Sequence, residues 1–230
     1  MGKGAILRWI ENKMLARHLH GCGVEIGALG RPFPVRSGVH VWHVDRCDCG
    51  TLRRQYPEVS NVVLPDVLAD AASLPFAEAS LDFVIASHVL EHLPFPLAAL
   101  ADWYAALRPG GVLLLKIPDK RYTFDARRRR TSLHHLVTEH LDPDSFDPRA
   151  HFEDWVQYVG NREPGSEALR VETDDLMDQN YSIHYHVWTD EDIQELVHYT
   201  QSDMSMKWTE LLFLRAHFYR KECAVALRRE

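Results

Sequence analysis

The sequence predicts an α/β fold with a mostly parallel sheet that is covered by helices. Two observations lead to this class. First, short apolar segments alternate with segments of helical character between residues 23 and 118, and turn residues separate them. Second, residues 111–118 (GVLLLKIP) are apolar along almost their whole length, which a strand requires when it is buried on both faces. Alternation of strands and helices is typical of a parallel sheet.

The elements follow one another in a regular order up to residue 118. Residues 1–20 have apolar side chains close to helical spacing and too many charges for a signal peptide, so they predict an amphipathic helix. Pro109 and the two glycines after it predict a turn over residues 108–111. A helix interrupted by two prolines is expected at residues 89–107. Strands are expected at residues 23–27, 39–45, 61–68, 81–88 and 111–118.

The regular pattern stops after residue 118. Residues 119–188 are polar and rich in His, Arg and Asp, yet they carry scattered aromatic residues. This composition favours an ordered insertion that caps the sheet. The pattern returns at residues 189–201, a helix for which Thr189 is the expected N-cap, and two closing strands follow. We therefore expect a single domain over residues 1–230, with an insertion after the fifth strand.

Composition narrows the class of protein. The net charge of −7 argues against a general nucleic-acid binder, which usually has a basic surplus. No apolar run approaches the ~18 residues that span a bilayer. The four cysteines form no CxxC pair and no disulfide framework, which indicates free thiols in a reducing compartment. We expect a cytoplasmic protein without a membrane span or a nucleic-acid partner.

The turn after the first strand, within GVEIGALGRPFP (residues 23–34), predicts a cofactor site. Ligands of open parallel sheets bind at the carboxyl ends of the strands. The dinucleotide pattern GxGxxG is absent, because Leu29 and Arg31 occupy the later glycine positions, so a diphosphate would be poorly held. Three acids instead follow or end successive strands: Glu25, Asp45 and Asp70. They suit a cofactor with a cationic amine, a ribose and an adenine, which describes S-adenosylmethionine.

Several motifs carry a resemblance to a known family. VEIGALGRPF, HVWHVD, DVLADAASLPFAEASLDFVIASHVLEHL and ALRPGGVLLLKIPDKRYTF together resemble the class I S-adenosylmethionine-dependent methyltransferases. The resemblance implies a Rossmann-like, seven-stranded sheet with a closing antiparallel hairpin. The sequence departs from the family in the turn, where it has EIGALG instead of ExGxGxG. The expected cofactor-binding residues are Glu25, Gly27, Ala28, Leu29, Asp45, Arg46, Asp70, Ala71 and His88.

Histidines are the candidates for the chemistry at the methyl acceptor. A hydroxyl is a poor nucleophile and benefits from a base or a metal ion. The expected catalytic residues are His135, His140 and His88; if residues 132–140 are helical, His135 and Glu139 share a face. Asp119 directly follows the fifth strand, and His184 and His186 would point the same way on an extended segment. These three residues are the expected ligands of a Mg²⁺ ion.

The resemblance extends to a methyltransferase subgroup associated with glycan assembly, through IPDKRYTFD, TSLHHL and HYHVW. It implies O-methylation of a sugar or oligosaccharide hydroxyl, as in the synthesis of mycobacterial methylmannose polysaccharide. The alternatives are metal-independent methylation of a small carboxylate, amine or phenol, an inactive cofactor-binding subunit, and a nicotinamide oxidoreductase, which the turn disfavours. The insertion is expected to act as a lid or as the arm of a homodimer. Arg127–Arg130 (RRRR) is expected to be a solvated face or a contact to an anionic acceptor.

Overall fold

A mixed sheet of seven strands forms the centre of the molecule in the computed structural model, which describes residues 2–230. The strand order is β3-β2-β1-β4-β5-β7-β6. β7 runs antiparallel to both of its neighbours, β5 and β6, and forms the closing hairpin with β6. The seven-stranded, Rossmann-like fold that the sequence predicts is therefore confirmed. The strands are β1 (Cys22–Ile26), β2 (His40–Asp45), β3 (Val67–Leu68), β4 (Leu81–Ser87), β5 (Leu107–Pro118), β6 (Trp208–Leu214) and β7 (Glu222–Arg229).

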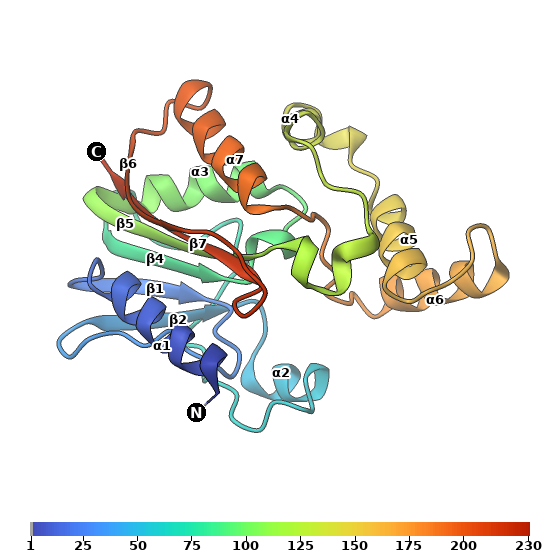
Figure 1. The fold of residues 1–230 in the computed structure, drawn as a ribbon, viewed down its shortest axis with the longest axis horizontal. Coiled ribbons are helices and arrows are strands. Elements are labelled where there is room, and N and C mark those ends of the chain that lie inside the picture. Colours follow the sequence, from blue (N-terminus) through green and yellow to red (C-terminus); the bar gives the residue numbers. More distant parts are fainter. Residues whose placement is uncertain (1) are drawn as a thin grey trace.

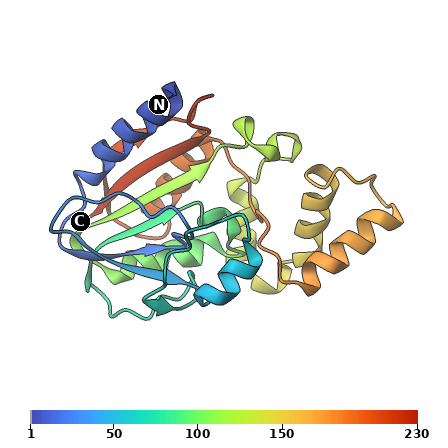
Figure 2. The ribbon, with the colours of Figure 1, turned by 90° about the horizontal axis from the view of Figure 1, so that it is seen from below.

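Helices cover both faces of this sheet (Figures 1 and 2). One face carries α1, and the other carries α3 and α7, while α4, α5 and α6 extend beyond one edge of the sheet. The α-helices are α1 (Lys3–Ala16), α2 (Cys49–Gln55), α3 (Pro96–Ala106), α4 (Leu133–Leu141), α5 (Pro148–Tyr158), α6 (Glu167–Asp178) and α7 (Asp190–Ser202). Short 3₁₀ turns are η1 (Leu90–His92), η2 (Lys120–Tyr122), η3 (Phe124–Arg127) and η4 (Pro143–Ser145). None of the helices within residues 2–230 is both long and apolar enough to cross a membrane.

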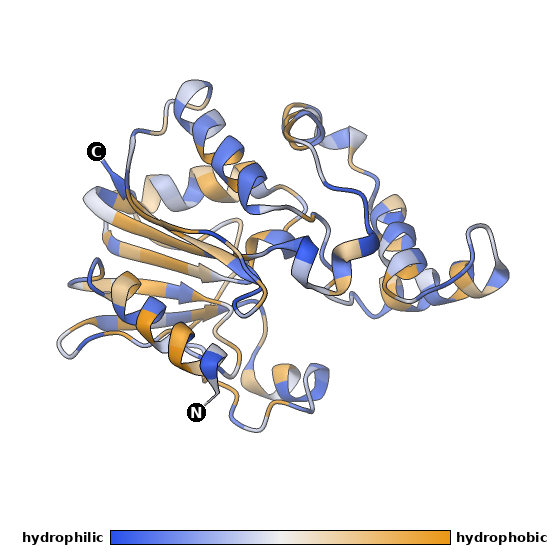
Figure 3. Ribbon diagram, viewed as in Figure 1, coloured by the Kyte–Doolittle hydropathy of each residue, from blue (hydrophilic) through white to orange (hydrophobic). Residues whose placement is uncertain are grey.

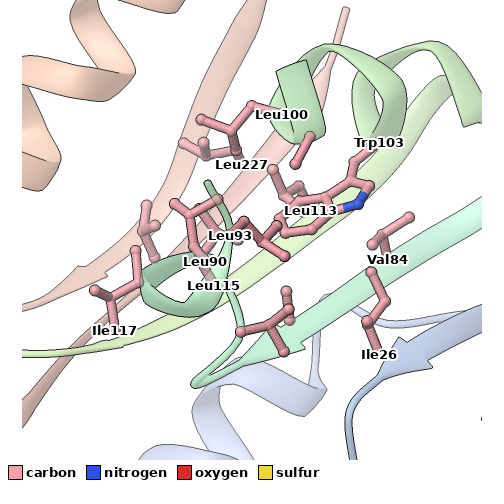
Figure 4. Close-up of a cluster of buried hydrophobic side chains, with 14 of the residues drawn as sticks. Ile26, Val84, Leu90, Leu93, Leu100, Trp103, Leu113, Leu115, Ile117 and Leu227 are labelled. Atoms are coloured by element: carbon pink, nitrogen blue, oxygen red, sulfur yellow. The ribbon is translucent and has the colours of Figure 1, made fainter. Parts of the chain in front are cut away.

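The apolar run of β5 fills two separate cores, because successive side chains of a strand point to opposite faces. Leu113 and Leu115 belong to the core beneath α3 and α7, where Trp103 of α3 packs close to Leu113 (Figure 4). Leu114 belongs to the smaller core beneath α1, together with Leu15. All of these side chains are at most 1% exposed.

Two local predictions need correction. Residues 108–111 do not separate a helix from a strand; they belong to β5 and form a bulge, since Leu81 pairs with Leu107 and Phe83 with Val112. Gly110 has a φ of 82° there, a conformation that glycine adopts at little cost. The expected helix at residues 89–107 divides into η1 and α3, because Pro94 and Pro96 interrupt the helical hydrogen bonds.

The chain leaves the sheet after β5 and returns before α7 at neighbouring positions. Asp119 and Trp188 form an isolated parallel bridge, and the Lys120 N–H donates to the Trp188 carbonyl at 2.8 Å. The residues between them form η2 to α6, whose ribbon is largely hydrophilic in contrast to the central strands (Figure 3). Each of α4, α5 and α6 begins at a Ser or Asp side chain that accepts a backbone N–H of the first turn.

Candidate active site

The carboxyl ends of the parallel strands meet at one edge of the sheet. Ile26 at the end of β1 lies beside Val44 on β2 and Ala86 on β4. Asp45 and Ser87, the last residues of β2 and β4, therefore belong to the same edge. This is the edge at which open α/β sheets bind ligands, and α4, α5 and α6 extend from it (Figure 1).

Glu25 supports the turn that follows β1. Its carboxylate is 1% exposed and accepts the Phe33 backbone N–H at 2.8 and 3.0 Å. His43 lies beside it, with 3.6 Å between Nε2 and Oε2. Burial raises the pKa of Glu25 to about 7, although the hydrogen bond from Phe33 acts in the opposite direction. The carboxylate thus ties residue 33 back to β1 and closes the loop that the turn begins.

The conformation of the turn explains its glycines. Gly27 has a φ of 63° and its N–H donates to the Val44 carbonyl at 2.9 Å. Leu29 also has a positive φ, of 47°. A Cβ on Gly30 would lie 2.3 Å from Cγ1 of Val59, so only glycine lets the turn pack against that loop. The outer turn thus differs from a glycine-rich phosphate loop.

Asp45 and Asp70 present carboxylates at the same edge. Asp45 is half-buried and accepts the Cys47 N–H at 3.4 Å, and burial raises its pKa. Asp70 is exposed and its Oδ1 accepts the Ala72 N–H at 2.8 Å. The other residues of the expected cofactor set near these acids are partly buried or exposed: Ala28, Arg46 and Ala71.

A cavity of about 390 Å³ lies beside this edge. It is lined by the ends of β4 and β5, by the first residues of the insertion and by the start of β7. Its lining residues are His88, Pro118, Tyr122, Thr123, Phe124, His184 and Lys221. Polar side chains and the aromatic rings of Tyr122 and Phe124 thus surround a space that can hold a small molecule.

His88 is held between two carboxylates. Its backbone has a φ of 56°. Its Nε2–H donates to Glu222 at 2.5 Å, and Nδ1 lies 3.5 Å from Glu91. Burial opposes the charged ring, but the hydrogen bond to Glu222 and the charge of Glu91 outweigh it and raise the pKa of His88. His88 is therefore better suited to donate a hydrogen bond than to accept a proton.

A second histidine of the cavity has the arrangement of a general base. The Nδ1–H of His184 donates to Asp125 at 2.7 Å, which leaves the lone pair of Nε2 available. Asp125 is 1% exposed, and Arg128 donates to its other oxygen at 3.0 Å. Burial would raise the pKa of Asp125, but the bonds from His184 and Arg128 lower it. Asp125 thus stays ionised and fixes the orientation of the imidazole.

Sequence reasoning missed this pair. Asp125 stands 59 residues before His184, within an aperiodic region that offers no spacing rule. The sequence does show His184, in the motif HYHVW, but the motif predicted it as a metal ligand and not as a base. The structure brings His88 and His184 to one cavity, and this grouping could not be read from either motif.

The three expected metal ligands do not come together. The carboxylate of Asp119 is fully buried and accepts hydrogen bonds from the Arg121 backbone, the Arg121 guanidinium and the Asp190 N–H. Its oxygens are therefore occupied, and Asp119 caps η2 and anchors the start of α7. Within residues 2–230, His184 and His186 belong to different groups of candidate ligands, and neither group contains Asp119.

The expected bases of α4 lie elsewhere. Residues 133–141 are helical, and His135 Nε2 lies 3.1 Å from Glu139, so the shared face is confirmed. His140 is half-buried near the end of the helix. Neither His135 nor His140 is among the residues that line the cavity. His88 and His184 line the cavity without them.

Arg128, the second residue of the run Arg127–Arg130, is neither solvated nor open to an anionic ligand. Arg128 is 3% exposed and donates to Asp125, to Asp154 at 2.7 Å and to the His184 carbonyl at 2.8 Å. Arg130 lies 3.3 Å from Asp192 of α7. Arg128 therefore has a structural role that a run of like charges does not predict.

Comparisons with known proteins agree with this geometry. Residues 20–115 match the family model described as a methyltransferase domain. Over 85 residues the chain is 34% identical to a "probable S-adenosylmethionine-dependent methyltransferase" of Mycolicibacterium smegmatis. That stretch covers 36% of this chain and 30% of the relative, so the similarity spans less than a third of the relative's length.

Solved structures share the fold. The N-methyltransferase NodS of Bradyrhizobium japonicum, in complex with S-adenosyl-L-homocysteine, has a TM-score of 0.50 at 13% identity, covering 99% of this chain and 88% of that one. A protein described as a "putative Zn-dependent alcohol dehydrogenase" of Rhodobacter sphaeroides has a TM-score of 0.58 at 14% identity, covering 96% and 90%. At such identity these likenesses show the fold alone. Strand order and family match agree: the sheet has the order typical of the class I methyltransferase fold, and residues 20–115, less than half of the chain, are similar to a methyltransferase domain.

Proposed function

We propose that the chain transfers a methyl group from S-adenosylmethionine to a hydroxyl of a sugar or oligosaccharide, with His184 as the general base. The observation that carries the proposal is the Asp125–His184 pair, which lines a cavity next to the carboxyl ends of β4 and β5. The expected bases His135 and His140 lie outside that cavity's lining. The base role therefore moves to His184.

The cofactor-binding roles rest on the positions of the acids at the sheet edge. Asp45 ends β2 and would accept from the ribose hydroxyls of the cofactor. Asp70 and the backbone at Ala71 would recognise the adenine. The turn at Gly27–Gly30, which Glu25 braces, would hold the methionine part. NodS, a structural neighbour, is described in complex with the demethylated cofactor, which is consistent with this use of the fold.

The proposed reaction is an in-line displacement at the methyl carbon. When bound, S-adenosylmethionine supplies an electrophilic methyl group, so the acceptor oxygen forms a bond to carbon as the carbon–sulfur bond breaks. Nε2 of His184 takes the proton of the acceptor hydroxyl, and Asp125 stabilises the imidazolium that results. Lys221, directly before β7, lines the cavity and would donate a hydrogen bond that orients the acceptor.

The cavity lining favours a polyhydroxylated acceptor. Phe124 is 57% exposed and its ring lies 4.9 Å from that of His184, so it offers an aromatic face beside the base. Tyr122, Thr123 and Lys221 provide hydrogen-bonding groups around it. The motif resemblance to glycan-associated methyltransferases points to a methylated mannoside as a specific acceptor. A small carboxylate, amine or phenol is the alternative, and it would need no base as well placed as His184.

The residues do not fit the expected Mg²⁺ ion. The oxygens of Asp119 are occupied by Arg121 and Asp190. The candidate ligands nearest the cavity are Glu91, His92 and His184, which offer one carboxylate and two imidazoles. Mg²⁺ prefers oxygen ligands in near-octahedral geometry. We therefore derive no step of the reaction through this ion.

The test is the release of S-adenosylhomocysteine over a panel of mannosides, glucosides, phenols, carboxylates and amines, each with and without EDTA. We expect turnover on a sugar and a loss of about 10²–10⁴-fold in kcat for His184→Asn, with unchanged cofactor affinity by calorimetry. Asp125→Asn should lower kcat in the same direction, because it no longer favours the tautomer with a free Nε2. His134→Asn, on the exposed face of α4, is the matched control.

Three outcomes would contradict the proposal in different ways. Turnover only on an acid, amine or phenol would overturn the acceptor. A loss of turnover in His140→Ala but not in His184→Asn would return the base to α4. Turnover that EDTA abolishes and that Mg²⁺, but not Zn²⁺, restores would show that Mg²⁺ takes part in the reaction.

A further inference from the structure

A second group of histidines lies within the insertion and outside the lining of the cavity. His135 and Glu139 are on α4, His151 is on α5, and His186 is in the segment between α6 and α7. The ligand atoms of the three histidines lie within 4.8 Å of one another. Three histidines from three parts of the chain thus converge on Glu139.

We propose that His135, Glu139, His151 and His186 form a binding site for a divalent transition-metal ion, with Zn²⁺ as the best match. The proposal is independent of the proposed methyl transfer, since none of these side chains lines the acceptor cavity. The argument rests on the spacing of the ligands, on their unpartnered atoms and on their outer hydrogen bonds.

The spacing is that of ligands around a small ion. Oε1 of Glu139 lies 3.1 Å from Nε2 of His135 and 3.0 Å from Nε2 of His151. Zn–N bonds of about 2.0–2.1 Å in a tetrahedral site place neighbouring ligand atoms roughly 3.3 Å apart. Nε2 of His186 lies 4.0 Å from Oε2 of Glu139 and donates its N–H to the Pro94 carbonyl at 3.1 Å, so the unpartnered Nδ1 is the atom that would bind an ion. The distances from Glu139 to His135 and His151 are therefore close to those between neighbouring ligands of a tetrahedral ion, and the ligand atoms of all three histidines lie within 4.8 Å of one another.

Two atoms of the group are buried and lack a hydrogen-bond partner. They are Oε2 of Glu139, in a residue 5% exposed, and Nδ1 of His186, in a residue 0% exposed. A buried polar atom without a partner costs about 1–3 kcal/mol, so a native structure usually provides one.

The outer contact of His151 also matches a metal ligand. Its Nδ1–H donates to the Tyr185 carbonyl at 3.0 Å, while Nε2 faces Glu139. Ligating histidines generally donate their second N–H to a carbonyl or carboxylate, which fixes the ring and its tautomer. Both nitrogens of His151 face acceptors, so an ion at Nε2 would replace the second proton that the ring otherwise needs.

The donor set selects the kind of metal and its role. Three imidazoles and one carboxylate suit Zn²⁺ and similar transition metals and not Mg²⁺ or Ca²⁺. Four protein ligands leave no open position in a tetrahedral site, which is typical of structural zinc. An ion there would fasten α4 and α5 to the segment of His186, which returns the chain to the sheet.

The experiment uses the full chain, stripped with a chelator and titrated with Zn²⁺ in a calorimeter, with metal content measured by mass spectrometry. We expect one bound equivalent and a higher melting temperature in its presence. His151→Gln and His135→Gln should each weaken Zn²⁺ binding by more than about tenfold. Loss of only an outer hydrogen-bond partner of a metal ligand already costs about 10–100-fold in metal affinity. His135 is half-exposed, so this variant should fold.

The control is His134→Gln, one residue away on α4 and exposed, which should bind Zn²⁺ as the wild type does. A wild type that binds no Zn²⁺ would overturn the proposal. So would His135→Gln and His151→Gln proteins that retain wild-type affinity. Binding that is lost in His92→Gln but kept in His151→Gln would place the ion at the other group of candidate ligands. None of these results depends on methyl transfer.

Discussion

At the scale of single residues, identical side chains have different roles because their surroundings differ. Asp45 and Asp119 both stand at the carboxyl edge of the sheet, one ending β2 and the other following β5. Asp119 accepts from Arg121 and Asp190 with both oxygens. Asp45 is half-buried and accepts only a long hydrogen bond from Cys47. A ligand can therefore bind to Asp45, whereas Asp119 is already part of the framework.

Glu25 provides a prediction about pH and stability. Its pKa is raised from 4.5 to about 7, so the folded state binds more protons than the unfolded state between these values. Stability from this group therefore falls as the pH rises through that window. At pH 8, the free energy of unfolding of Glu25→Gln should exceed that of the wild type by up to about 3 kcal/mol, measured by urea denaturation.

The difference between the two proteins should vanish below about pH 4.5 and grow up to about pH 7. Glu58→Gln, at an exposed glutamate, should show no such window. A difference that is the same at every pH would refute the raised pKa. We also expect Glu25→Gln to weaken cofactor binding, because the charge beside the turn is lost.

At the scale of elements, the insertion is held together by polar contacts as much as by apolar packing. Leu136 of α4 and Val156 of α5 are buried, but Arg128 joins η3, α5 and the His184 segment through three hydrogen-bonded groups. N-cap side chains at the starts of α4, α5 and α6 help to explain why residues 119–188 form helices although they lack the regular alternation of strands and helices. This packing fixes the positions of Asp125 and His184.

Replacing Arg128 should therefore destabilise the protein. The side chains of Arg128 and Asp125 are each 2% exposed, and removal of one partner leaves a buried charge. We expect Arg128→Met to lower the free energy of unfolding by about 3–5 kcal/mol, measured by urea denaturation. Arg129→Met, at the exposed neighbour, should be close to neutral. Equal effects of the two substitutions would show that Arg128 is solvated.

At the scale of the whole molecule, one strand supports two cores. Leu113 and Leu114 are both 0% exposed and face opposite sides of β5. Leu113→Ala and Leu114→Ala should each lower the free energy of unfolding by about 2–5 kcal/mol, in a single transition followed by tryptophan fluorescence. A cost below about 1 kcal/mol for Leu114→Ala would mean that α1 does not enclose a true core.

The sequence predicts what local rules control. Apolar runs and turn residues located the strands of the sheet, although β3 comprises only Val67–Leu68 of the expected residues 61–68. Strand ends placed Asp45 and Asp70 at the carboxyl edge of the sheet. The bulge at Gly110 was missed because it depends on the pairing of β5 with β4. The Asp125–His184 pair was missed because its members are 59 residues apart in an aperiodic region. No periodicity connects such residues before the chain has folded.

The bridge between Asp119 and Trp188 has an evolutionary consequence. Since the insertion departs and returns at adjacent positions, its length and sequence can change without shifting the register of any strand. A lineage could therefore exchange this segment for another and acquire a different binding surface while the carboxyl edge of the sheet stayed intact. The same property makes the bridge a natural junction for constructing chimeric enzymes.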